Sequence, residues 1–180
     1  YLMMAVARAE GAPVRWTAAI AVGAAAGVGF ALKPYFLAAP LLVELALVLR
    51  TRRPLQAVRG ETVSLAAVVA AYGAAVLLLT PSYVNEVVPL VGRIYWAFES
   101  SFAMVVLPAI IEMLGLAAAL YLYANGSRSS LQLVLLAAAL GFLLSYFLQG
   151  KGYSYHLFPV RALVGASLVL HLVGLLRSPR

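Results

Sequence analysis

The chain has 180 residues, of which 64% are hydrophobic and 11% charged, and its mean hydropathy is +0.99. This excludes an ordinary soluble domain, the absence of apolar–polar alternation excludes a β-barrel, and the absence of cysteine excludes disulfides and thiolate metal sites. The net charge of +7 comes from basic residues at the ends of apolar runs, which favours membrane topology signals over nucleic-acid binding. We therefore predict an all-α, multi-spanning transmembrane helix bundle.

The apolar runs predict about six spans in a single transmembrane region. An apolar opening without the basic start of a signal peptide indicates that residues 1–7 are a helix remnant, so we expect the C-terminal part of a longer protein. A single helix over 17–49 would be about 50 Å long, so a tight hairpin at Lys33-Pro34 is the better interpretation. The predicted spans are 17–32, 35–49, 61–80, 102–124, 131–148 and 158–176.

The connection over 81–101 is not a simple loop. From Val87 onward it is apolar and aromatic with isolated charges, which is typical of a helix lying at the membrane surface. On the outer side of the membrane, this segment could cover a groove that faces the lipid, or it could merely connect two spans.

The basic residues divide unequally between the two sides of this topology. Nine arginines fall on one side, and four basic residues fall on the other, so the first side is predicted to be cytoplasmic. The cytoplasmic set is Arg8, Arg15, Arg50, Arg52, Arg53, Arg59, Arg128, Arg177 and Arg180, and the outer set is Lys33, Arg93, Lys151 and Arg161.

Both lysines of the chain lie on the predicted outer side, each followed by aromatic residues and a proline. Lys33 precedes Pro34-Tyr35-Phe36. Lys151 belongs to a polar island over 149–156, which also carries Tyr153, Tyr155 and His156. An ammonium group suits a phosphate oxygen, and tyrosine hydroxyls can bind phosphate or sugar hydroxyls. Lysine and tyrosine are also ordinary anchors at a membrane edge, and that alternative stays open.

Two glutamates lie within predicted spans, where ionisable side chains are costly and point to function. Glu112 is near the middle of its span and is expected to face the bundle interior. Glu44 is near the cytoplasmic end, where it could reach the membrane surface or pair with Arg50.

Three segments together resemble the later half of bacterial integral-membrane glycosyltransferases of the GT-C superfamily. They are residues 29–36, the turn at 81–83 leading into 86–90, and residues 149–159. The resemblance implies an enzyme of the bacterial cytoplasmic membrane that takes a sugar from a polyprenyl-phosphate donor on the outer face. It also implies a catalytic carboxylate in an early outer loop. The chain contains no aspartate, so we expect that loop to lie upstream of Tyr1.

Glycosyl transfer needs a general base for the acceptor and cations for the leaving phosphate. The candidate bases within this chain are Glu86 and Glu99. The candidate lipid-phosphate and substrate ligands are Lys33, Tyr35, Arg93, Lys151, Tyr153, Tyr155 and His156. We predict no metal site and no cofactor on this chain, and a divalent metal would belong to the upstream region. The expected partners are the bilayer and the polyprenyl-phosphate sugar. A secondary transporter centred on Glu112 and a non-catalytic membrane scaffold remain the alternatives.

Overall fold

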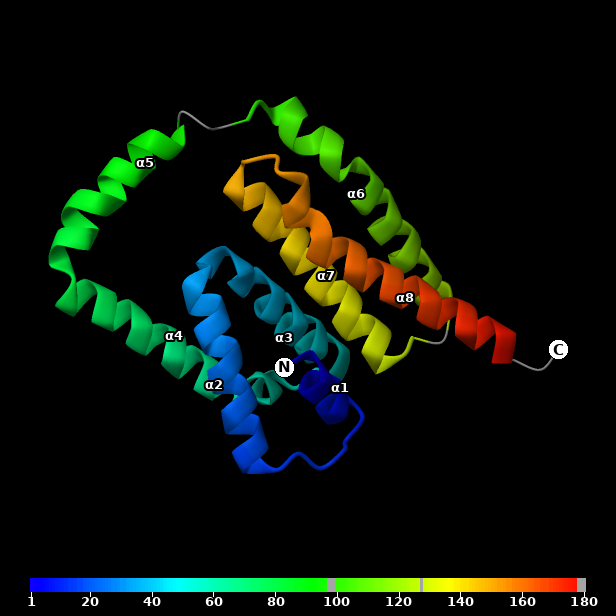
Figure 1. Ribbon diagram of the computed structural model, residues 1–180. Coiled ribbons are helices and arrows are strands. Elements are labelled where there is room, and N and C mark those ends of the chain that lie inside the picture. Colours follow the sequence, from blue (N-terminus) through cyan, green and yellow to red (C-terminus); the bar gives the residue numbers. More distant parts are fainter. Residues whose placement is uncertain (97–99, 127, 178–180) are drawn as a thin grey trace.

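The computed structural model describes residues 1–96, 100–126 and 128–177, and within these ranges every regular element is helical (Figure 1). Five helical stretches are long and apolar enough to cross a membrane, which confirms the all-α class and indicates a multi-pass membrane protein. They are Pro34–Thr51, Gly60–Leu79, Phe102–Asn125, Ser130–Gln149 and Ser154–Arg177. A sixth apolar helix, α2 (Trp16–Leu32), is shorter, with 17 residues. The short α1 (Leu2–Ala9) precedes it.

The hairpin expected near Lys33 is present. Helix α2 ends at Leu32, and the 3-10 turn η1 (Pro34–Leu37) leads directly into α3 (Ala38–Thr51), which turns back and diverges from α2 (Figure 1). Proline at the start of η1 suits the turn, because its ring fixes φ and its missing N–H is not needed there. Pro40 falls in the first turn of α3, where proline is tolerated, so the helix continues through it.

Helix α2 packs along α4 (Gly60–Leu79) through a row of small residues spaced four apart. The row is Ala19, Gly23, Gly27 and Ala31, all buried. A Cβ on Gly23 would collide with the backbone of Glu61, and one on Gly27 would lie 2.8 Å from the Cβ of Val68. The small residues therefore allow the two backbones to approach closely, as is common between membrane helices. Gly23 lies beside Glu61 and Gly27 beside Val68, so α2 and α4 run in the same direction.

Helix α7 (Ser130–Gln149) is the centre of the packed region. On one side α3 crosses it so closely that a Cβ on Gly141 would collide with the backbone of Ala39. On the other side lie α6 (Phe102–Asn125) and α8 (Phe158–Arg177), whose buried residues join Leu136 and Tyr146 of α7 in one apolar core. A second core joins α1, α3 and α7. The 3-10 turn η4 (Ser154–Leu157) connects the end of α7 to α8.

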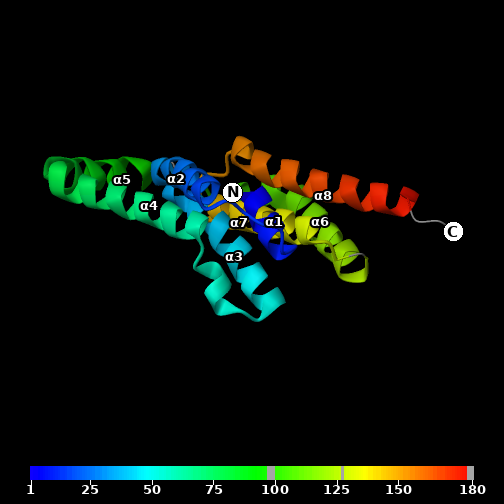
Figure 2. The same cartoon turned by 90° about the horizontal axis from the view of Figure 1, so that it is seen from below.

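The segment expected at the membrane surface is helical in its described part. A π-helical turn, η3 (Tyr83–Val87), follows α4 and continues into α5 (Val88–Trp96). In both views α4 and α5 form an arm to one side of the α6–α8 region, and in Figure 1 α5 turns back toward the start of α6 (Figures 1 and 2). The described side chains of α5 are largely exposed, which leaves its apolar residues open to lipid or to another chain.

Candidate functional site

The two lysine-containing turns meet at one end of α7, here called the lysine end (residues 33–37 and 150–157). The Ser145 hydroxyl donates a hydrogen bond of 2.6 Å to the backbone carbonyl of Tyr35. One helical turn earlier, the ring of Phe142 meets that of Phe36 edge-on, with centroids 5.2 Å apart. These contacts fix the turn after α2 against the last two turns of α7, close to the point where the polar island begins.

The aromatic side chains of the island form a compact group. The ring of His156 lies 4.2 Å from that of Tyr155 and 5.8 Å from that of Tyr153, and the two tyrosine rings stack at 5.7 Å. Lys33 lies within electrostatic range of His156 and places its Nζ 4.6 Å from the centroid of the Phe36 ring. Tyr155 is 67% exposed, so its hydroxyl is open to a ligand, as are the exposed side chains of Tyr35 and Tyr153.

Two glycines shape the backbone around Lys151. Gly150 caps α7 at φ +60° and Gly152 has φ +66°, a region that L side chains rarely adopt. A Cβ on Gly152 would lie 2.8 Å from the carbonyl oxygen of Met104, so glycine also permits the island to lie against α6. The Ser100 hydroxyl donates a 3.0 Å hydrogen bond to the carbonyl of Lys151, which ties the approach to α6 to the same turn.

Two of the predicted site residues lie elsewhere. Glu86 is exposed on η3 and Arg93 is exposed on α5, and this arm lies apart from η4 in both views (Figures 1 and 2). Glu99 lies outside the described residues. The structure therefore brings Lys33, the aromatic group and the Lys151 turn to one end of the molecule, without Glu86 or Arg93.

The opposite end of the bundle holds a buried charge network that the sequence analysis missed. Here Arg8 donates two hydrogen bonds to Glu61, Nε to Oε1 at 2.7 Å and Nη2 to Oε2 at 2.9 Å. Glu61 is 1% exposed, and Arg59, also buried, places Nη1 3.9 Å from its Oε1. We call this region, formed by α1, by α3 from Glu44 onward and by the start of α4, the arginine end. The sequence signal was Arg59 two residues before Glu61 at the start of an apolar helix.

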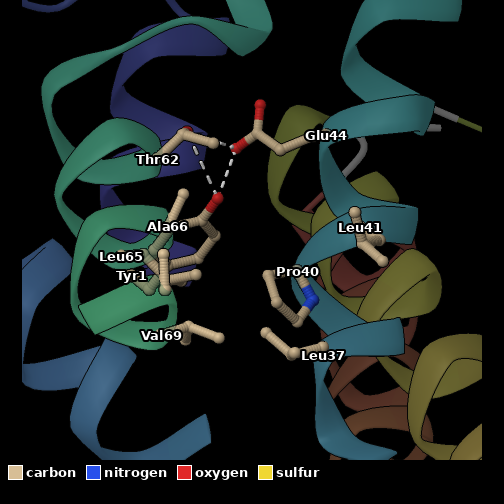
Figure 3. A pocket seen from close by; sticks show the side chains of 10 residues that line it. Tyr1, Leu37, Pro40, Leu41, Glu44, Thr62, Leu65, Ala66 and Val69 are labelled. Carbon is tan, nitrogen blue, oxygen red and sulfur yellow. Dashed lines mark hydrogen bonds between the residues drawn. The ribbon is translucent and has the colours of Figure 1, made fainter. Parts of the chain in front are cut away.

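Glu44 belongs to this network, and it follows neither of its two expected alternatives, since it is buried and pairs with Arg59 rather than with Arg50. Its Oε2 accepts from Nη2 of Arg59 at 3.1 Å, and its Oε1 accepts from the hydroxyls of Tyr1 at 2.6 Å and Thr62 at 3.4 Å (Figure 3). Residues six apart on a helix point in different directions, so Arg50 is poorly placed to reach Glu44. Burial, reinforced by the Glu44 carboxylate, raises the pKa of the Tyr1 phenol well above its usual range and keeps it a donor.

A cavity of about 330 Å³ opens between α3 and α4 beside Glu44 (Figure 3). Apart from Tyr1, Glu44 and Thr62, its lining is apolar: Leu37, Pro40, Leu41, Leu65, Ala66, Val69 and Ala70. Leu37 is the last residue of η1, so the cavity extends along α3 from the lysine end toward the arginine end. Such a lining suits a hydrocarbon chain.

Glu112 faces the bundle interior, as expected for a mid-span carboxylate, and is 4% exposed. Its Oε1 accepts a hydrogen bond from Nε of Arg161 on α8. Tyr146, buried on α7, donates a 2.7 Å hydrogen bond to the carbonyl of Val105 and lies within electrostatic range of Glu112. In the sequence, Arg161 could be recognised only as one of the basic residues of the predicted outer side.

Within the described ranges, no three His, Asp or Glu side chains gather closely enough to hold a metal ion. No protein-family model matches this chain, and neither a curated protein nor a solved structure matches it.

Proposed function

We propose that this chain is the part of a membrane glycosyltransferase that seats a polyprenyl-phosphate sugar at the outer face of the bacterial cytoplasmic membrane. The observation that carries the proposal is the convergence of both lysine-containing turns and of Tyr153, Tyr155 and His156 at one end of α7. The resemblance of the same segments to GT-C glycosyltransferases supports it. The bilayer and the lipid-linked sugar are the proposed partners.

The chemistry of the lysine end suits a leaving phosphate. Phosphate carries negative charge that increases as the glycosidic bond breaks, and cations positioned beside it lower the barrier. Lys33 and Lys151 would supply that charge. The exposed hydroxyls of Tyr35, Tyr153 and Tyr155 would donate hydrogen bonds to phosphate or sugar oxygens.

The cavity between α3 and α4 would hold the lipid part of the substrate. It begins at Leu37, directly after the Lys33 turn, and continues along the apolar side chains of both helices. A phosphate held at Lys33 would therefore have an apolar groove below it for the first isoprene units. The base for the acceptor hydroxyl would come from a carboxylate outside the lysine end. Within this chain the candidates are Glu86 and Glu99, whereas the resemblance implies a carboxylate in an early outer loop.

The direct test is binding of decaprenyl phosphate, with decaprenol as the matched ligand that lacks the phosphate, to the chain in phosphatidylcholine nanodiscs. We expect decaprenyl phosphate to bind more tightly, and Lys33→Met and Lys151→Met each to weaken it. A charge-assisted contact contributes about 1.5–3 kcal/mol, which corresponds to roughly 10- to 100-fold in affinity. Arg50→Met, an exposed cation at the arginine end, is the matched control. Equal affinity for the two ligands, or wild-type binding by both lysine variants, would overturn the proposal.

The outer-face assignment has its own test in this cysteine-free chain. We expect Tyr155→Cys, at an exposed position of the lysine end, to react with a membrane-impermeant maleimide from the outside of intact cells. Arg50→Cys should react only after the membrane is opened. The reverse pattern would place the lysine end in the cytoplasm and remove a donor on the outer face as its ligand.

A further inference from the structure

Arg161 differs from Arg8 in how few of its guanidinium N–H groups make hydrogen bonds. Its side chain is 53% exposed although it lies in an apolar helix, and it donates through Nε alone to Glu112. Arg8, by contrast, uses both Nε and Nη2 on Glu61. Among the residues that the structure describes, nothing accepts from Nη1 or Nη2 of Arg161, and the buried Oε2 of Glu112 also has no partner there.

Such an arrangement is costly inside a membrane. A polar group without a partner in hydrocarbon costs several kcal/mol, and ionisable residues in spans usually face a partner or a ligand. Because Arg161 is only three residues inside α8, about 4.5 Å along the axis, its free end is within reach of the headgroup layer at the lysine end.

The geometry of the guanidinium selects the ligand. With Nε held by Glu112, the edge formed by Nη1 and Nη2 remains, and this planar edge matches two oxygens of a phosphate. Glu112 acts as a positioning residue here, because its hydrogen bond with Nε orients the guanidinium of Arg161.

The surroundings of Arg161 indicate an apolar tail on that ligand. Along one face of α8, Phe158, Val169 and Leu172 are 70%, 59% and 55% exposed, at spacings that place them in line with Arg161. On the same line, a Cβ on Gly165 would meet nothing within 4 Å. Within the described part of α8, Arg161 is thus the charged residue at the N-terminal end of an open apolar stripe.

We propose that Arg161 binds the phosphate of a membrane lipid whose hydrocarbon chain lies along this stripe of α8. The ligand chemistry is a phosphate on a long apolar chain, which an anionic phospholipid or a polyprenyl phosphate would supply. The site is separate from the lysine end and does not rest on the proposed glycosyltransferase function. It binds the lipid at the surface of the α6–α8 region, where the phosphate oxygens would also accept from the Nη1 and Nη2 groups of Arg161, which have no acceptor among the described residues.

The experiment measures lipid adducts of the full chain by native mass spectrometry in a neutral detergent. Three probes are added separately: phosphatidylglycerol, decaprenyl phosphate and inorganic phosphate, with phosphatidylcholine as the reference lipid. We expect a tight adduct with phosphatidylglycerol or with decaprenyl phosphate, whichever is the natural source, and at least tenfold weaker binding in Arg161→Gln. The decaprenyl phosphate measurement is made in a Lys33→Met/Lys151→Met background, so that binding at the lysine end does not mask the result. Arg161→Lys should be intermediate, because it keeps the charge but not the planar edge.

Arg177→Gln, an exposed arginine at the far end of the same helix, is the control and should bind as the wild type does. If Arg161→Gln does not fold, the double variant Glu112→Gln/Arg161→Gln removes both charges together and should restore folding without lipid binding. Wild-type affinity in Arg161→Gln or in the double variant would overturn the proposal. So would equal losses in Arg177→Gln, or inorganic phosphate competing as well as either lipid.

Discussion

The two ends of this helix bundle handle charge in opposite ways. At the arginine end, Arg8 and Arg59 are turned inward and paired with Glu61 and Glu44, both nearly inaccessible. At the lysine end, Tyr35, Tyr153 and Tyr155 are largely exposed, and Lys33 lies over the ring of Phe36 and near His156. One end uses its polar groups to hold helices together, whereas the other presents them outward.

This difference shows why a count of basic residues does not reveal their roles. Arg8 and Arg59 counted only toward the charge bias of the predicted cytoplasmic side, yet each reaches a buried carboxylate from a different element. Removing one partner of a buried pair leaves an uncompensated charge, which costs far more than losing an exposed one. The comparison therefore predicts large effects on stability at the arginine end and small ones at the lysine end.

The largest effect is expected for Glu61→Ala. This change leaves Arg8 without its two hydrogen bonds and removes the nearer charge from Nη1 of Arg59, so the free energy of unfolding should fall by about 3–5 kcal/mol. Unfolding followed by circular dichroism in mixed micelles with increasing dodecyl sulfate measures it. Glu86→Ala, on the exposed η3, is the matched control and should change stability by about 0.5 kcal/mol or less. A loss below that of the control would mean that the arginine end is not held by its ion pairs.

An intermediate effect is expected for Gly23→Ala, which tests whether the close approach of α2 and α4 supports the arginine end. The added methyl would collide with the backbone of Glu61, so we expect a loss of about 1–3 kcal/mol in the same assay. Gly29→Ala, in the same helix with open space at its Cβ, should be neutral or raise stability by up to about 1 kcal/mol. If both variants behaved alike, helix propensity rather than close packing would explain the result.

The smallest effect on stability is expected for Lys33→Met at the lysine end. The change removes a cation over the Phe36 ring, an interaction worth about 0.5–1 kcal/mol at an accessible site. The unfolding curve should therefore shift little, while binding of decaprenyl phosphate weakens. A loss of stability as large as that of Glu61→Ala would show that Lys33 is structural, and the contrast between the two ends would fail.

The helices themselves were readable from the sequence. The expected spans over 61–80, 102–124, 131–148 and 158–176 differ from α4, α6, α7 and α8 by no more than about a residue at either end. Long apolar runs bounded by Arg, Pro, Gly and Ser leave few alternatives, because a backbone in hydrocarbon must satisfy its hydrogen bonds internally. The turn at Lys33-Pro34 followed from length alone, since one helix over 17–49 would be too long for one crossing.

The candidate site was readable only in part. The lysine-containing turns could be assigned to one side because successive spans alternate in direction, so Lys33 and the 149–156 island had to face the same way. That the two turns lie together at the end of α7 depends on tertiary contacts. The Ser145 hydroxyl bonds to the carbonyl of Tyr35 and the ring of Phe142 packs on that of Phe36, which holds the Lys33 turn against α7. The same reasoning placed Glu86 and Arg93 on that side as well, but they lie on the arm formed by α4 and α5, away from the island.

Composition and the length of the apolar runs alone therefore determined the class of fold and the order of the helices. Partner choice was decided by the tertiary structure. Whether Glu44 meets Arg50 or Arg59, and whether Glu112 meets Arg161, depends on which helix faces pack together, and in α2 and α7 that is set by single glycines such as Gly23 and Gly141. Helices that are apolar on all sides carry little periodic signal for their neighbours, because lipid and protein interior are equally apolar.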